Sequence, residues 1–184
     1  MNASKLAAGA IVISALVAGV AMYYLQVYAF YDEVKFEPGN EIRLVPIASD
    51  VPEAIVADDV KGIDGDASPL KFRACFTTPL SQAMLTETYR LYEDRPEPNY
   101  APGWFDCFDA EAIGEALERG EALAFLSEPL KEYGMDRVVA VFPDGQAYAW
   151  HQINSCGKAY YDGRDLPAGC PTPPADDGTP EGSN

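Results

Sequence analysis

The sequence contains little of the chemistry that enzymes and metal sites need. Only one histidine, His151, occurs in 184 residues. No serine lies in a G-x-S-x-G nucleophile elbow, and the sequence has no phosphate-binding loop and no dinucleotide fingerprint. A zinc site needs three or four ligands, which one histidine and oxidised cysteines do not readily supply. We therefore predict no metal, no cofactor and no catalytic residue.

Basic residues are also scarce. The chain has 13 Lys and Arg against 29 Asp and Glu, which gives a net charge of −16. Nucleic acid and anionic lipid surfaces repel a domain of this charge. The charge keeps the domain soluble, and it can also steer a basic protein toward it. The composition therefore excludes nucleic acid as a partner and leaves a basic protein partner open.

A long apolar run is the most prominent feature that is present. No charged side chain occurs from residue 6 to residue 31, and ~20 apolar residues in a helix suffice to cross a ~30 Å hydrocarbon core. We predict a transmembrane helix over 6–31, preceded by a short cytoplasmic N-terminus over 1–5. A signal peptide cleaved near Ala21 is the alternative, although the apolar run continues beyond it. Aromatic rings that fit a headgroup layer crowd its C-terminal end: Tyr23, Tyr24, Tyr28, Phe30 and Tyr31.

The charges that flank this run predict its orientation. Lys5 and the amino terminus precede it, and Asp32 and Glu33 follow it, which favours a single-pass protein of the bacterial inner membrane with its N-terminus inside and its C-terminal domain in the periplasm. Small residues that let another helix approach recur at helical spacing along one face: Ala7, Ala10, Ser14, Ala18 and Ala21. The alternative is that small residues are simply common in such spans.

The cysteines point to the same compartment. Cys75, Cys107, Cys156 and Cys170 are even in number, which predicts two structural disulfides in an oxidising environment. Three pairings are possible, and the pairing of neighbours, Cys75 with Cys107 and Cys156 with Cys170, closes the shorter loops. A thioredoxin-like redox site is unexpected because no C-x-x-C occurs.

The rest of the chain predicts one small α+β domain with an antiparallel sheet and about two helices, in addition to the N-terminal transmembrane helix. We expect a stalk over 32–40, the periplasmic domain over 41–166, and a disordered, acidic tail rich in Pro and Gly over 167–184. The clearest element is a hairpin of 136–142 and 146–153. The other expected elements are strands at 41–47, 54–60, 70–76 and 122–126, and helices at 79–92 and 110–119.

Aromatic residues near the histidine form the candidate ligand cleft. Its members are Trp104, Phe105, Tyr148, Trp150 and His151. The alternative for the aromatic cluster is core packing over a disulfide. As a catalytic residue, His151 would be a hydrolase base that pairs with a carboxylate. The alternative is that His151 is a packed or capping residue.

Four stretches carry a resemblance to a known family. They are AMYYLQVYAFY (21–31), FRACFTTPL (72–80), APGWFDCFDAE (101–111) and DRVVAVFPDGQAYAWHQ (136–152). The chain resembles an uncharacterised family, a domain of unknown function, of single-span membrane proteins from alphaproteobacteria, Rhodobacter-like bacteria in particular. This resemblance implies a small membrane protein without an assigned activity, and no catalytic residue is carried over.

Together these features favour a membrane-anchored periplasmic protein that is not an enzyme and that binds or supports another envelope protein or complex. The alternative is a periplasmic ligand-binding or sensory domain that uses the aromatic cleft. A hydrolase that uses His151 is the third hypothesis.

Overall fold

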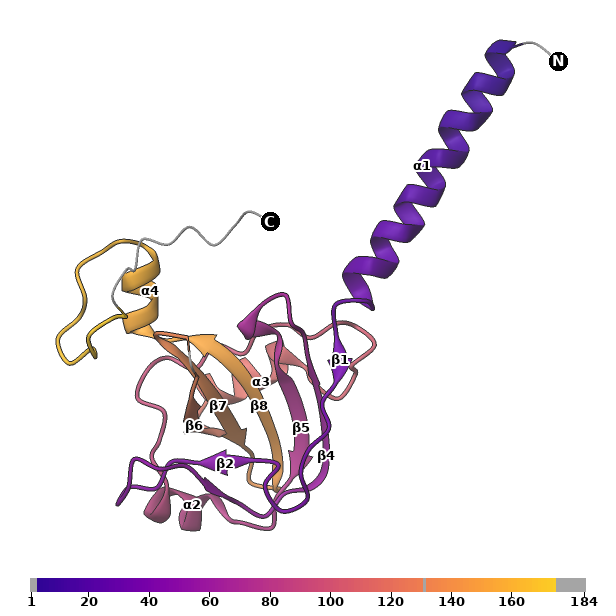
Figure 1. Cartoon of the computed structure of the whole chain (residues 1–184). Helices are drawn as coiled ribbons and strands as arrows, with labels where there is room; N and C mark the ends of the chain where they lie inside the picture. The colour runs from indigo at the N-terminus through magenta and orange to yellow at the C-terminus, as the bar shows by residue number, and fades with distance from the viewer. Residues whose placement is uncertain (1–2, 131, 175–184) are drawn as a thin grey trace.

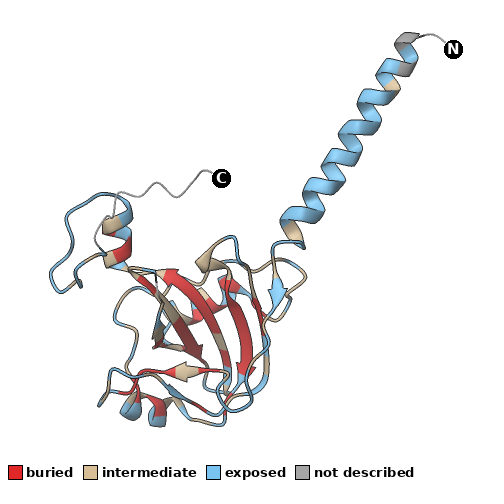
Figure 2. Cartoon of the chain, in the orientation of Figure 1, coloured by how far each residue is buried: buried red, intermediate tan, exposed pale blue. Residues whose placement is uncertain are grey.

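In the computed structural model, which describes residues 3–130 and 132–174, one long helix projects from an antiparallel sheet domain (Figure 1). Helix α1 (Ala3–Val27) is exposed along nearly its whole length (Figure 2). Its 21 residues Ala7–Val27 have a mean hydropathy of 2.0, so α1 is long and apolar enough to cross a membrane. The helix ends before the predicted residue 31 because residues 28–30 form a turn. Parts of the expected N-terminus and tail, 1–2 and 175–184, lie outside the described residues.

The domain is organised around one six-stranded antiparallel sheet, and the predicted α+β class is confirmed. The strand order is β1-β4-β5-β8-β7-β6. A separate two-stranded sheet pairs β2 (Arg43–Leu44) with β3 (Glu53–Ala54). The strands of the large sheet are β1 (Asp32–Glu33), β4 (Asp58–Asp64), β5 (Arg73–Thr77), β6 (Leu123–Pro129), β7 (Met135–Val141) and β8 (Gln146–Ile153).

The predicted hairpin lies inside this sheet, between β5 and β6. Strands β7 and β8 pair from Val141 opposite Ala147 to Met135 opposite Ile153. Gly145 supplies the left-handed backbone conformation of the turn, with φ of 86°. The hairpin matches the sequence-based prediction because β-branched and aromatic residues flank a Pro-Asp-Gly turn.

Both faces of the sheet are covered, so neighbouring residues of one strand can both be buried (Figure 2). One face carries Ala147 and Ala149 and packs against Leu85 of helix α2 (Gln82–Thr88) and the β2–β3 sheet. The other face carries Trp150 and packs against Ile113 of helix α3 (Ala110–Glu118). Successive side chains of a strand point to opposite faces, which fixes Trp150 on one side and His151 on the other.

The predicted helix at 110–119 is confirmed, and its boundary signals act as expected. The Asp109 side chain accepts hydrogen bonds from the backbone N–H groups of Glu111 and Ala112. Gly120 follows the helix with φ of 69°.

The predicted helix at 79–92 is wrong at both ends. It begins at Gln82, where Ser81 is the N-cap, while the Thr78 hydroxyl donates to the Val56 carbonyl instead. It ends at Thr88 because Tyr89 is extended and forms a bridge with Pro46. A short helix that the sequence did not predict, α4 (Ser155–Tyr161), follows β8.

Several strand boundaries also differ from prediction. The run at 41–47 yields only β2, the run at 54–60 divides between β3 and β4, and the run at 70–76 begins as the 3-10 turn η1 (Pro69–Lys71). The segment expected to be a stalk pairs with the sheet. Strand β1 lies beside β4, and the Val34 N–H donates to the Gly62 carbonyl (2.9 Å).

Candidate functional site

The five residues predicted to line one aromatic cleft do not line a common hollow, although Phe105 and Tyr148 pack against the hydrophobic cluster that contains Trp150. Trp104 and Phe105 line a hollow of about 420 Å³ beside β1 and β4. Tyr148 lines a second hollow and His151 a third. Trp150 is fully buried, with its ring 6.5 Å from that of Phe108. The structure therefore brings Trp104 and Phe105 together, separates them from His151, and makes Trp150 part of the core.

His151 is held at both ring nitrogens. Its Nδ1 lies 2.6 Å from the Pro69 carbonyl oxygen, and its Nε2 accepts from Arg137 Nε at 2.9 Å. A carbonyl can only accept, so Nδ1 carries the proton of a neutral ring. Burial, with the positive charge of Arg137 second, lowers the pKa of His151 to about 3. Neither nitrogen is free to take a proton from a substrate in this arrangement.

The partners of His151 are themselves packed inside the domain. The Phe72 ring stacks on the imidazole with centroids 4.6 Å apart, and the Arg137 guanidinium lies 4.1 Å from the Phe72 centroid. Arg137 also forms an ion pair with Glu128. Burial lowers the pKa of Arg137, and this ion pair opposes that change. The cluster therefore acts as a polar support inside the domain.

One edge of this cluster borders an acidic hollow of about 370 Å³. His151 contributes to its wall, and Asp64, the least exposed of its carboxylates, has its pKa raised by burial. No cluster able to hold a metal occurs within residues 3–130 and 132–174. Five carboxylates give the hollow a chemistry suited to a cationic group: Asp32, Glu33, Asp64, Asp66 and Glu132.

The most specific contacts outside the core join the end of α1 to the domain. The Trp104 indole Nε1 donates to the Val27 carbonyl (2.7 Å). This carbonyl belongs to the last turn of the helix, where carbonyls lack helical partners. The Trp104 ring stacks on Tyr28 with centroids 6.2 Å apart and meets Tyr31 edge-on at the same separation.

A second set of contacts holds the chain just after α1. Lys71 Nζ donates to the Phe30 carbonyl (3.3 Å), and it lies 4.9 and 5.1 Å from the ring centroids of Phe30 and Tyr31. Gly65 passes so close that a Cβ there would lie 2.2 Å from the Phe30 carbonyl oxygen. We call this contact between residues 27–31, the turn at 65–71 and Trp104 the junction.

The loop that carries Trp104 is fixed from strand β5. Its end is tied to Cys75 through the Cys75–Cys107 disulfide. Its start is held by Arg73, which donates to the Asn99 carbonyl (2.7 Å) and the Tyr100 carbonyl (3.3 Å). Burial lowers the pKa of Arg73 to about 10. The sequence prediction missed Arg73, and the available signal was a charged residue inside an otherwise apolar strand.

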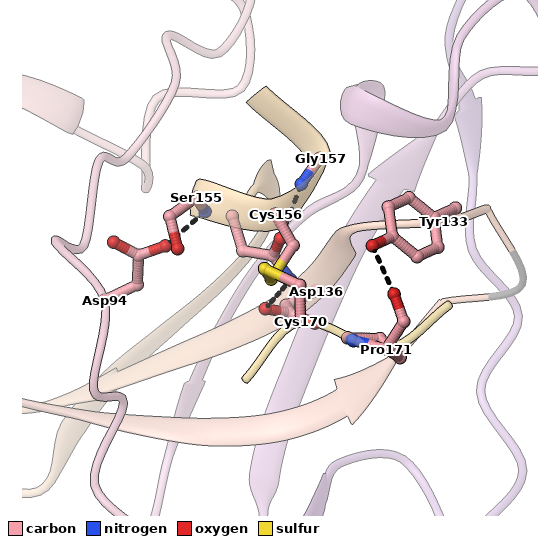
Figure 3. The surroundings of a disulfide bond; sticks show 9 residues. Asp94, Tyr133, Asp136, Ser155, Cys156, Gly157, Cys170 and Pro171 are labelled. Atoms are coloured by element: carbon pink, nitrogen blue, oxygen red, sulfur yellow. Dashed lines mark hydrogen bonds between the residues drawn. A yellow bond between two sulfur atoms is a disulfide. The ribbon is translucent and has the colours of Figure 1, made fainter. Parts of the chain in front are cut away.

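The second disulfide holds α4 and the following segment (Figure 3). Cys156 of α4 is bonded to Cys170, and next to it the Tyr133 hydroxyl donates to the Pro171 carbonyl (2.7 Å). Asp136 accepts from Asn154, the N-cap of α4, at 2.9 Å, and burial raises the pKa of Asp136. Of the three pairings that the sequence left open, the structure has the pairing of neighbouring cysteines, which closes the shorter loops.

The small residues predicted to form a helix-packing seam are all exposed on α1. The Ser14 hydroxyl donates to the Ile11 carbonyl (2.9 Å) of its own helix. Because these residues are exposed, the seam is accessible to another helix, and its role stays a prediction. They are Ala7, Ala10, Ser14, Ala18 and Ala21.

Comparisons with known proteins identify the family but no activity. Neither a curated protein nor a solved structure matches the chain. A family model described as a family of unknown function, DUF6446, matches residues 42–171, well over half of the chain. The match covers strands β2 to β8, both disulfides and Trp104, whereas β1 and the junction residues 27–31 precede it. The chain therefore belongs to the DUF6446 family of unknown function.

Proposed function

We propose that this protein is anchored in the bacterial inner membrane by α1, with its N-terminus inside and its domain in the periplasm, and that it binds or supports another envelope protein or complex without catalysing a reaction. The junction carries the proposal. A helix long enough to span a membrane is bonded to the domain through Trp104, and the turn that follows the helix is bonded through Lys71. Such contacts hold a binding surface at a fixed angle to the membrane, which a freely jointed tether would not do.

Two features support the proposed side of the membrane. Both disulfides lie in the domain, and disulfides form and persist in oxidising compartments. Lys5 precedes the span, whereas Asp32 and Glu33 follow it. Basic residues stay on the cytoplasmic side more often than acidic ones, so this difference favours an exported domain.

The acidic hollow is the best candidate for the surface that meets a partner. Strand β1, which follows α1 after the short segment 28–31, contributes Asp32 and Glu33, so the hollow lies at the membrane-proximal side of the domain under this proposal. Opposite charge steers association and helps to select a partner. We therefore propose a basic surface on another envelope protein as the partner of this hollow.

A matched pair of charge reversals tests the proposal in the native membrane. The first variant carries Asp66→Lys and Glu132→Lys, two exposed carboxylates of the hollow. The second carries Glu87→Lys and Glu111→Lys, exposed carboxylates on α2 and α3 that change the net charge equally. Tagged full-length chains are crosslinked in cells, and captured proteins are quantified by mass spectrometry.

The proposal expects the same envelope protein to be captured by the wild type and by the Glu87/Glu111 variant, and to be lost from the Asp66/Glu132 variant. Equal capture by both variants would contradict the role of the hollow. Recovery of the wild-type chain alone would contradict partner binding itself.

A ligand-binding or sensory role is the second candidate, and the size of the acidic hollow favours it. Its volume of about 370 Å³ lies at the low end of the usual range for small-molecule sites. A cationic ligand is the chemistry that its carboxylates fit. Titration of the full chain with a polyamine by calorimetry separates this candidate from the first, since saturable binding that Asp66→Lys removes supports a small ligand. The hydrolase hypothesis is disfavoured because both ring nitrogens of His151 already have hydrogen-bond partners inside the domain.

A further inference from the structure

We infer that the loop 99–104 is a second membrane contact, in which Tyr100 and Trp104 lie in the headgroup layer of the same bilayer that α1 spans. This inference rests on the proposed membrane anchor. It adds that the domain touches the bilayer through a surface of its own, with zwitterionic phospholipid headgroups as the binding partner.

The position of Trp104 along the membrane normal follows from its bond to α1. Val27 is the last residue of the 21-residue apolar stretch, so its carbonyl lies where the hydrocarbon core gives way to headgroups. Trp104 Nε1 is 2.7 Å from that carbonyl oxygen. The indole therefore lies at the depth where tryptophan and tyrosine are enriched in membrane proteins. Tyr28, on which it stacks, belongs to the same aromatic layer.

Tyr100 extends this aromatic layer away from the helix. Tyr100 is 79 % exposed, the largest exposure among the exposed large hydrophobic residues that the structure describes. Its backbone is held, because the buried guanidinium of Arg73 binds the carbonyls of both Asn99 and Tyr100. Arg73 also donates to the Leu70 carbonyl, next to the Lys71 that contacts Phe30. The same guanidinium thus holds the backbone of Tyr100 and the turn at 65–71, whose Lys71 contacts the chain just after α1.

The charge of the chain selects the kind of lipid. A net charge of −16 opposes approach to an anionic surface. Tyrosine and tryptophan rings need no opposite charge, since an apolar ring body enters the boundary layer while the hydroxyl or indole N–H meets water and headgroups. Zwitterionic headgroups therefore match the loop better than acidic ones.

Tryptophan fluorescence in lipid vesicles tests the inference, because the chain has only two tryptophans. Full-length protein is placed in phosphatidylcholine vesicles that carry a nitroxide either at the headgroup or deep in the acyl chain. Trp150 is fully buried, so quenching of the wild type beyond that of Trp104→Phe reports on Trp104. A third tryptophan is then introduced as Tyr100→Trp, with all native residues around the junction kept.

The matched control is Met84→Trp, an exposed position on α2 at the end of the domain opposite α1 (Figure 1). The quenching that Tyr100→Trp adds should be at least about twice that added by Met84→Trp with the headgroup nitroxide, and it should weaken with the deep nitroxide. Equal quenching of the two variants would overturn the inference.

Flotation of the same samples after alkaline carbonate shows whether α1 anchors the chain in the vesicle. It therefore separates failure of the loop contact from failure of the anchor. Chains that float but show no added quenching at position 100 would overturn the loop contact and leave the anchor standing. Chains that do not float would overturn both. Quenching at position 100 in chains that float supports the inference.

Discussion

At the scale of single residues, the buried charged and polar groups act on one another rather than on solvent. His151, Arg137 and Phe72 form one stack, and Arg73 holds the loop 99–100 from within the sheet. The sequence favoured a packed role for His151, because a lone histidine on a strand has no catalytic partners nearby. The sequence did not reveal the partners of His151. Arg137 reaches it because the β7–β8 register places the two residues opposite each other, and Pro69 reaches it from a turn distant in sequence.

The neutral state of His151 predicts how stability depends on pH. Folding lowers its pKa from 6.5 to about 3, so between these values the folded chain binds fewer protons than the unfolded chain. This contribution to stability is complete above the unfolded pKa and is lost as pH falls toward 3, with a limiting slope of about 1.4 kcal/mol per pH unit. His151→Gln should remove it, which urea unfolding of the full chain in detergent would measure.

Asp64 and Asp136 provide an internal reference for that experiment. Burial raises the pKa of both carboxyls, so the stability they contribute is lost as pH rises, opposite in sign to His151. Both groups stay unchanged in His151→Gln. The difference between wild type and variant should therefore grow as pH rises from about 3 and level off near pH 7. A difference that is constant with pH would contradict the account of His151.

At the scale of elements, turn and capping residues in the sequence predicted the β7–β8 hairpin and helix α3, because local interactions form both. The hairpin has its turn residues between two apolar strands, and α3 has both a capping aspartate and a terminating glycine. Helix α4 has only seven residues and contains Gly157, whose backbone touches Gly134. A helix so short forms through tertiary contacts, here a disulfide and the Asp136–Asn154 bond, which the sequence does not display.

Removing either disulfide should lower the free energy of unfolding by a similar amount, but only one of the two removals should change the environment of Trp104. The chain-entropy model gives about 3–4 kcal/mol for the loop closed by Cys75 and Cys107 and about 3 kcal/mol for the shorter loop of Cys156 and Cys170. Replacing Cys75 and Cys107 by alanine should also free the loop 99–107 and shift Trp104 fluorescence. Replacing Cys156 and Cys170 should lower the free energy of unfolding without that shift.

Urea unfolding gives the cost of each replacement, and fluorescence of the folded chain gives the environment of Trp104. The Trp104→Phe variant supplies the signal of Trp150 alone. An unchanged Trp104 signal after loss of Cys75–Cys107 would show that this disulfide does not position the loop.

At the scale of the whole molecule, the sequence predicted the apolar helix, the α+β class and two disulfides, but it left the pairing of the cysteines open. It did not predict how the helix meets the domain. Trp104 and Val27 are 77 residues apart, and no periodicity or motif links them. The segment 32–40 looked like a stalk because it is short and charged, yet β1 pairs with β4 within it. The helix and the domain are therefore joined by a strand and by the junction rather than by a free tether.

One distance measurement tests this central claim most directly. Spin labels are attached at Lys5→Cys, before the apolar stretch, and at Glu87→Cys on α2, since all four native cysteines are in disulfides. Pulsed electron resonance on the full chain in nanodiscs gives the distribution of distances between them. A fixed junction predicts one narrow distribution that broadens in Trp104→Ala. A broad distribution in the otherwise wild-type chain, unchanged by Trp104→Ala, would contradict it.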